Sequence, residues 1–222
     1  MLLTGGASRR LGMDKSGIDI GDGPLAARTA RLLQSVADPA LELGPGRSSL
    51  PHLPDAQPGQ GPLAALVSGW AELRRRSCHR PVLVVATDLP FLSARLLEWL
   101  AGHPGAGSVI PVHDGQPQPL CSRYCPADLD TATKLYRLGA RSMRALLAEI
   151  EPRLIPPQEW QVAAGHGLAL NDLDTPADLE HARRAAGLLY GAAERETTVG
   201  PGTTVEPGRT VEPGRTARRG TP

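Results

Sequence analysis

Two short stretches of the chain combine residue types that suit a phosphorylated ligand. The first runs from Leu3 to Lys15, where small residues allow backbone N–H groups to approach phosphate, and Arg10 and Lys15 add positive charge. The second contains Asp88, whose carboxylate follows an apolar segment and offers the hard oxygen ligands that Mg²⁺ prefers. Together they predict a site for a metal-bound triphosphate.

The glycine-rich stretch differs from two common phosphate-binding motifs. In the P-loop the lysine directly follows the last glycine, whereas here Met13 and Asp14 separate Gly12 from Lys15. The dinucleotide fingerprint G-x-G-x-x-G is also absent from it. An isolated aspartate at a strand end often caps a turn or helix. For Asp88, the Leu-Pro that follows and the upstream glycine loop favour the metal role.

The elements that must position these residues alternate between strand and helix. Residues 81–86 are β-branched and apolar without alternation, which predicts a central parallel strand covered on both faces. A short strand at 2–3 enters the glycine loop, and further strands are expected at 39–43 and 108–112. Helices are expected at 24–36, 61–76, 94–101, 128–138, 142–150 and 175–193. This order predicts an α/β fold with a single doubly wound, mostly parallel sheet.

In such sheets the ligands bind beyond the carboxyl ends of the strands, which is where Gly5, Gly6 and Asp88 fall. We expect one domain over residues 1–194, because 222 residues with 41% hydrophobic content suit a single core plus a tail. From residue 198 a Pro/Gly-rich six-residue repeat predicts that 195–222 is disordered. Because so few residues precede the glycine loop, we expect a weak first strand or a natural start upstream.

Composition narrows the function classes. The 24 basic and 23 acidic residues nearly balance, which argues against attraction to nucleic acid or to a membrane surface. Three cysteines, an odd number, and no visible signal peptide predict a cytoplasmic protein. The CxxxC spacing of Cys121 and Cys125 lacks the further ligands of a zinc site.

The segment from Leu3 to Lys15 closely resembles the signature loop of molybdenum cofactor guanylyltransferases, which belong to the nucleotidyltransferase superfamily and attach GMP to molybdopterin. Further matches follow in the family's order, over roughly residues 2–185: Gly61-Pro62-Leu63-Ala64, Thr87-Asp88-Leu89-Pro90-Phe91-Leu92, Gln118-Pro119-Leu120, Arg141 to Leu146, and Asp172-x-Asp174-Thr175-Pro176-x-Asp178-Leu179. The resemblance implies a Rossmann-like nucleotidyltransferase fold, GTP as donor, Mg²⁺ and a molybdopterin-type acceptor. Molybdenum insertion proteins or molybdoenzyme chaperones are the protein partners that it suggests.

The resemblance also implies roles for individual residues. It assigns catalysis to Lys15, Asp88 and Arg10, and the magnesium ligand to Asp88. Nucleotide binding is implied for a set along both stretches: Leu3, Thr4, Gly5, Gly6, Lys15, Asp55 and Asp88. Asp55 aligns only loosely and is otherwise a solvated loop residue. Acceptor binding is implied for Asp172 and Asp174, which stand where the family commonly has asparagines.

We hypothesise in-line attack by the acceptor's terminal phosphate on the α-phosphorus of GTP, with release of pyrophosphate. A cytidylyltransferase or a phospholactate guanylyltransferase of the same superfamily is one alternative, and a non-catalytic nucleotide-binding homologue is another. Base specificity depends on backbone groups near Gly61 and in residues 41–50, where the family's nucleotide-contacting asparagine has no evident counterpart.

Overall fold

The computed structural model describes residues 1–5, 14–54 and 59–197, with side chains as far as residue 187. The described strands are β1 (Leu2–Leu3), β2 (Glu42–Leu43), β3 (His52–Leu53), β4 (Val82–Ala86), β5 (Val109–His113), β6 (Gln116–Pro117), β7 (Cys121–Tyr124) and β8 (Arg153–Ile155). The described helices are the 3₁₀ helix η1 (Lys15–Gly17) and α1 (Leu25–Val36), α2 (Pro62–Arg75), α3 (Ala94–Gly102), α4 (Pro126–Arg137), α5 (Met143–Leu147), α6 (Pro157–Ala164) and α7 (Pro176–Thr197).

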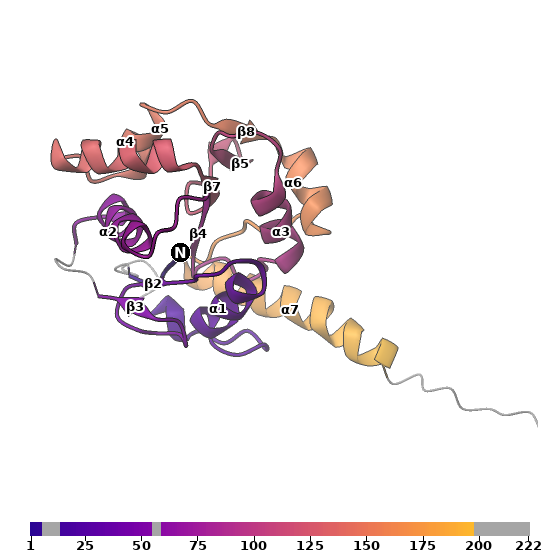
Figure 1. The fold of residues 1–222 in the computed structure, drawn as a ribbon. Helices are drawn as coiled ribbons and strands as arrows, with labels where there is room; N and C mark the ends of the chain where they lie inside the picture. The colour runs from indigo at the N-terminus through magenta and orange to yellow at the C-terminus, as the bar shows by residue number, and fades with distance from the viewer. Residues whose placement is uncertain (6–13, 55–58, 198–222) are drawn as a thin grey trace, which may run out of the picture.

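The described strands form one mixed sheet in the order β3-β2-β1-β4-β7-β5-β6, with β8 paired to β5 (Figure 1). Strands β3, β2, β1 and β4 run parallel to one another, and β8 runs parallel to β5. Strand β7 is antiparallel to both of its neighbours, β4 and β5. Strand β1 lies between β2 and β4 in the parallel part of the sheet, so Thr4, which follows β1, lies between the ends of these two strands.

Strand β4 is buried on both sides because helices cover both faces of the sheet. Leu83 and Val85 pack into a core with α1, α3 and α6, whereas Val82 and Val84 pack into a second core with α2, α4 and α5. The uninterrupted apolar run of β4 therefore serves two cores at once, as expected for a central strand of an α/β sheet.

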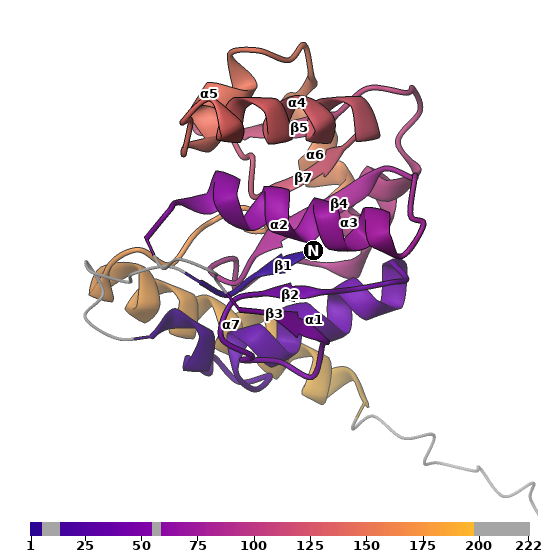
Figure 2. The same ribbon diagram turned by 60° about the vertical axis from the view of Figure 1, so that its left-hand side comes forward.

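A third hydrophobic cluster attaches α7 to the parallel half of the molecule. Leu179, Ala182 and Ala186 of α7 pack with Leu25 of α1 and with Phe91, which follows β4. Figures 1 and 2 both show α7 running alongside α1, beneath the parallel strands. Among the described helices, none is long and apolar enough to cross a membrane.

The predicted α/β fold with a mostly parallel central sheet is confirmed. Several boundaries differ, however: the strand expected at 39–43 is reduced to Glu42–Leu43, and α5 ends at Leu147. The segment between residues 43 and 61, for which no strand was expected, contains β3. Strands β6, β7 and β8 and helix α6 were not expected. The repeat region 198–222 lies outside the described residues.

Strand β7 escapes prediction because it is polar in sequence yet buried in the sheet. Ser122 and Arg123 are both buried. The Arg123 guanidinium donates to three backbone carbonyls, those of His103 (2.6 Å), Gly105 (2.9 Å) and Gly107 (2.8 Å). Buried polar groups are tolerated when they are hydrogen-bonded. Because these acceptors come from another loop, only tertiary structure reveals them.

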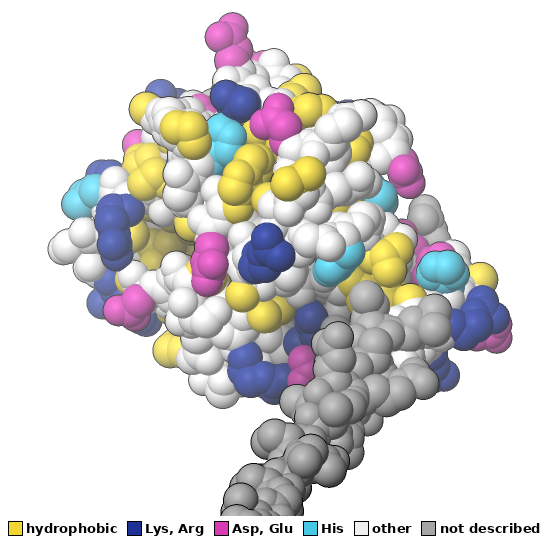
Figure 3. Space-filling view, turned by 90° about the vertical axis from the view of Figure 1, so that its right-hand side faces the viewer, with side chains coloured by type: hydrophobic (Ala, Val, Ile, Leu, Met, Phe, Trp, Pro, Cys, Tyr) yellow, Lys and Arg dark blue, Asp and Glu magenta, His cyan; other side chains and the backbone are white. Residues whose placement is uncertain are grey.

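The face shown in Figure 3 agrees with the near-zero net charge. Basic and acidic side chains are interspersed on it with hydrophobic ones, and neither sign gathers into a large patch. Because the net charge of the whole chain is only +1, an anionic ligand must be held by local charges.

Candidate functional site

The candidate site lies at the carboxyl ends of β1 and β4. Leu3 pairs with Ala86 in the sheet, and its carbonyl accepts a hydrogen bond from the Thr87 N–H at 3.2 Å. On the other side of β1, the Thr4 N–H donates to the Leu43 carbonyl at 3.1 Å. The glycine loop thus leaves the sheet beside Asp88, at the kind of strand edge where doubly wound folds bind ligands.

Lys15 and Asp88 meet at this edge. Lys15 Nζ lies 3.5 Å from Asp88 Oδ2 and 2.5 Å from Asp174 Oδ1. The lysine is placed by η1, whose N-cap Asp14 accepts hydrogen bonds from the Ser16 N–H (3.0 Å) and hydroxyl (2.6 Å). The two predicted catalytic residues that the structure describes therefore share one site.

The segment from Asp172 to Asp178 completes the acidic side of the site. The Leu173 N–H donates to the Asp88 carbonyl at 2.9 Å, which ties this segment to the end of β4. Thr175 and Asp178 then form a reciprocal capping box at the start of α7, with N–H to side-chain distances of 2.6 and 3.2 Å. This cap fixes Asp174 next to Lys15.

The electrostatics show an excess of negative charge. Burial raises the pKa of the Asp88 carboxyl, Lys15 opposes this rise, and the charges of Asp172 and Asp174 add to it. Desolvation and the charge of Asp174 likewise raise the pKa of Asp172. Asp178 behaves oppositely, because its hydrogen bonds from Thr175 lower its pKa. Three carboxylates facing one lysine suit a further cation.

Among the described residues, no group of three or more His, Cys, Asp and Glu side chains is arranged to hold a metal ion by itself. Mg²⁺, however, is commonly held by one or two carboxylates together with substrate phosphates. Asp88, partly exposed and next to other carboxylates, fits that form of binding, in which the ligand supplies the remaining oxygens.

Two of the sequence motifs also meet in space. Gly61 has φ +81°, and a Cβ there would lie 2.5 Å from the Arg141 carbonyl oxygen, so the backbones before α2 and α5 are in close contact. Arg141 Nε also donates to Gln60 Oε1 at 2.7 Å. This contact explains structurally why a residue without a side chain stands at position 61.

The predicted site residues fall into two groups. Those that the structure brings to one edge of the sheet are Leu3, Thr4, Gly5, Lys15, Asp88, Asp172 and Asp174. Gly6, Arg10 and Asp55 lie outside the described residues, and their roles stay predictions.

Sequence reasoning missed Glu42 and Arg47. Glu42 is fully buried and accepts the Thr4 hydroxyl at 2.6 Å, while Arg47 Nη2 lies 2.8 Å from Asp14 Oδ2. A signal was available, because a glutamate between two leucines in a strand, followed by Gly-Pro-Gly-Arg-Ser-Ser, indicates a buried carboxylate next to backbone donors.

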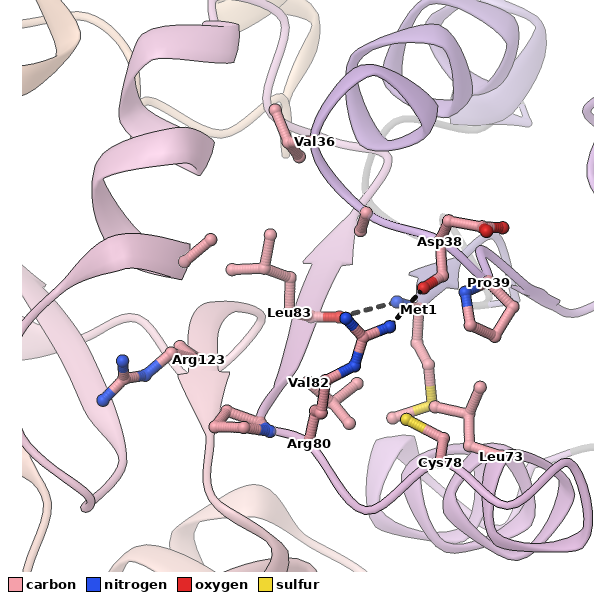
Figure 4. A pocket seen from close by; sticks show the side chains of 13 residues that line it. Met1, Val36, Asp38, Pro39, Leu73, Cys78, Arg80, Val82, Leu83 and Arg123 are labelled. Atoms are coloured by element: carbon pink, nitrogen blue, oxygen red, sulfur yellow. Dashed lines mark hydrogen bonds between the residues drawn. The ribbon is translucent and has the colours of Figure 1, made fainter.

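A cavity of about 250 Å³ lies elsewhere, at the opposite ends of β1 and β4 (Figure 4). The Met1 amino group lies in its wall and donates to the Leu83 carbonyl at 2.6 Å, and Arg80 donates to the Asp38 carbonyl at 2.9 Å. Neither Lys15 nor any of the clustered carboxylates lines this cavity. This cavity is therefore separate from the candidate site.

Comparisons with known proteins identify similar sequences and a similar fold. Residues 1–154 match the family described as MobA-like NTP transferase domain. A probable molybdenum cofactor guanylyltransferase of Mycobacterium avium is 31% identical over 192 residues, which cover 81% of this chain and 91% of the relative. One of Deinococcus radiodurans is 31% identical over 195 residues, with 80% and 90% covered.

The fold matches a crystal structure of molybdopterin-guanine dinucleotide biosynthesis protein A from Archaeoglobus fulgidus, with a TM-score of 0.68 and 23% identity. The match covers 85% of this chain and 98% of the other. At that identity the likeness supports a common fold.

Proposed function

Because the chain belongs to the MobA-like NTP transferase family, we propose that it transfers GMP from GTP to molybdenum-molybdopterin, giving molybdopterin guanine dinucleotide and pyrophosphate. The observation that carries the proposal is the 3.5 Å approach of Lys15 Nζ to Asp88 Oδ2 at the end of the central strands. The relatives named probable molybdenum cofactor guanylyltransferase support the choice of donor and acceptor.

The reaction requires little acid–base chemistry from the protein. An oxygen of the acceptor's terminal phosphate attacks the α-phosphorus of GTP in line with the leaving group. One phosphorus–oxygen bond forms, the bond to the bridging oxygen breaks, and that oxygen leaves with pyrophosphate. Catalysis then consists of aligning two anions and offsetting the charge that develops on the bridging oxygen.

Lys15 is the residue best placed to offset that charge. In the structure its ammonium is held by Asp88 and Asp174, and its side chain is only 15% exposed. When the donor binds, the ammonium exchanges part of this pairing for phosphate oxygens. The amides of Gly5 and Gly6, together with Arg10, add further donors on the loop side.

Asp88 is the proposed magnesium ligand. When bound, Mg²⁺ would neutralise triphosphate charge and fix the orientation of the α-phosphate. Asp88 supplies a carboxylate from the rigid end of β4, and the Leu173 N–H that donates to its carbonyl restricts its backbone. Asp172 and Asp174, whose charges act on Asp88, would bind the acceptor next to it.

Four further expectations accompany this proposal. The catalytic unit spans residues 1–194, and Asp55 contributes to nucleotide binding. The enzyme works in the cytoplasm, where molybdenum insertion proteins or molybdoenzyme chaperones handle its substrate and product.

The direct test combines the purified full chain with GTP, Mg²⁺ and molybdenum-loaded molybdopterin, and measures both pyrophosphate and dinucleotide product. Parallel reactions with CTP, and with phospholactate as acceptor, test the related activities. A preference for CTP would reassign the base, and guanylylation of phospholactate would reassign the acceptor. If no triphosphate with Mg²⁺ raises the melting temperature, the chain does not bind a nucleotide and the proposal fails.

A further inference from the structure

Glu42 is a buried carboxylate with an unusually complete set of donors. It lies in β2 with no solvent exposure. Oε1 accepts from the Thr4 hydroxyl (2.6 Å), the Gly46 N–H (2.8 Å) and the Arg47 N–H (2.6 Å), and Oε2 accepts from the Ser48 N–H (2.8 Å) and hydroxyl (2.7 Å). Burial opposes its ionisation, yet these hydrogen bonds outweigh burial and lower its pKa.

The groups that Glu42 holds belong to two different loops. Thr4 begins the glycine loop after β1, whereas Gly46 to Ser48 belong to the loop after β2. These loops are in direct contact, since a Cβ on Gly44 would overlap Thr4 Oγ1 and lie 2.9 Å from the Gly5 N. The Glu42 carboxylate therefore fixes the position of the loop after β2 relative to the start of the loop after β1.

The second loop brings a cation to the site. With its backbone N–H held by Glu42, Arg47 extends its guanidinium to Asp14, and Nη2 lies 2.8 Å from Asp14 Oδ2. Asp14 is the N-cap of η1 and directly precedes Lys15. The Arg47 side chain remains 52% exposed. Because a guanidinium has five N–H donors, Arg47 can bind a phosphate while it stays paired with Asp14.

We propose that Arg47 is a further cation for the triphosphate of the donor nucleotide, and that Glu42 is the positioning residue that places it and fixes Thr4 at the end of β1. This inference rests on the proposed transferase function, because it names an additional part of the same donor site. According to this proposal the loop after β2 is part of the donor site, because Glu42 holds the backbone of Arg47 in place.

The test compares variants by steady-state kinetics with GTP and Mg²⁺ and by titration of GTP binding. Arg47→Ala keeps the backbone N–H that Glu42 accepts, so the loop folds while the cation is lost. We expect KM for GTP to rise about tenfold, the range for loss of a charge-assisted bond. Arg47→Lys keeps the positive charge but lacks the paired N–H donors of a guanidinium, so its KM for GTP should lie between those of the wild type and Arg47→Ala.

Glu42→Gln places an NH₂ group against N–H donors, so at least one loop contact is lost. We expect GTP KM to rise in the same direction as for Arg47→Ala, and the double variant to fall well short of the product of the two effects. The matched control is Asp128→Asn on α4, a remote carboxylate that accepts the Ser108 hydroxyl at 2.6 Å. That change should lower stability and leave GTP KM unchanged.

The outcomes separate the two proposals. If the wild-type chain turns over and Arg47→Ala keeps the wild-type KM, the inference is wrong while the transferase function stands. The same holds if Glu42→Gln folds with an unchanged KM. If Glu42→Gln does not fold, Arg47→Ala alone decides. If the wild-type chain neither binds nor turns over GTP, the proposed function fails and the inference fails with it.

Discussion

Lys15→Met is the perturbation that most directly tests the candidate site. It removes the ammonium but keeps an unbranched side chain of similar length, so the packing of η1 is preserved. Three carboxylates then face one another without their central described cation, since Lys15 interacts with Asp88, Asp172 and Asp174. Both stability and turnover should respond.

The distance sets the size of the stability effect. At the 3.5 Å between Lys15 Nζ and Asp88 Oδ2, Coulomb's law gives about 1 kcal/mol in bulk water and about 5 kcal/mol at an effective dielectric constant of 20. With 15% and 30% of the two side chains exposed, the effective value falls between these limits. The variant no longer has to desolvate the Lys15 ammonium, which offsets part of the lost attraction. We therefore expect Lys15→Met to lower the free energy of unfolding by roughly 1–3 kcal/mol near pH 8.

The destabilisation caused by Lys15→Met should depend on pH. Without Lys15 the pKa of Asp88, already raised by burial, rises further, so protonation relieves the repulsion more readily. The destabilisation by Lys15→Met should therefore be clearly smaller at pH 5 than at pH 8. Turnover should fall by about 10²–10³, as when one preorganised donor is removed from an active site.

The assays are urea unfolding at pH 5 and pH 8, and initial rates of pyrophosphate release. The matched control is Lys134→Met, because the chain contains only these two lysines and Lys134 lies exposed on α4. The control should leave rate and stability nearly unchanged. Equal destabilisation at the two pH values, or a rate within about threefold of wild type, would refute the electrostatic reasoning.

Three other substitutions test separate parts of the structure. Asp88→Asn should reduce turnover. It should nevertheless raise the melting temperature of the ligand-free chain at pH 8, because the pKa of Asp88 is raised in the folded state and its ionisation at high pH therefore lowers the stability of the fold. Asp178→Ala removes the carboxylate half of the α7 capping box, leaves Thr175 as the N-cap, and should lower the free energy of unfolding by about 1 kcal/mol in denaturant at pH 7. Since hydrogen bonds lower the Asp178 pKa, that loss should shrink toward pH 3. Gly61→Ala pushes against the Arg141 carbonyl and should destabilise by more than about 1 kcal/mol, whereas Gly102→Ala meets nothing within 4 Å.

The sequence alone determined the order of elements around the site. The apolar run of β4 and the glycine loop after β1 are local patterns, and local patterns report strand, turn and helix directly. They also placed the predicted phosphate loop and Asp88 at strand ends that the fold does bring to one edge of the sheet. The positive charge of Lys15 follows from the same local reasoning, whereas the nucleotide-binding roles of Leu3 and Thr4 are what the family resemblance implies.

Tertiary structure decided which of these groups touch and what else joins them. Lys15 reaches Asp174, a residue 159 positions away, only because the capping box of α7 and the Leu173–Asp88 hydrogen bond bring that segment to β4. The burial of Glu42 and of the polar strand β7 likewise depends on donors and acceptors supplied by distant loops. Such contacts and the pKa shifts that follow from them arise from long-range packing, which no window of neighbouring residues encodes.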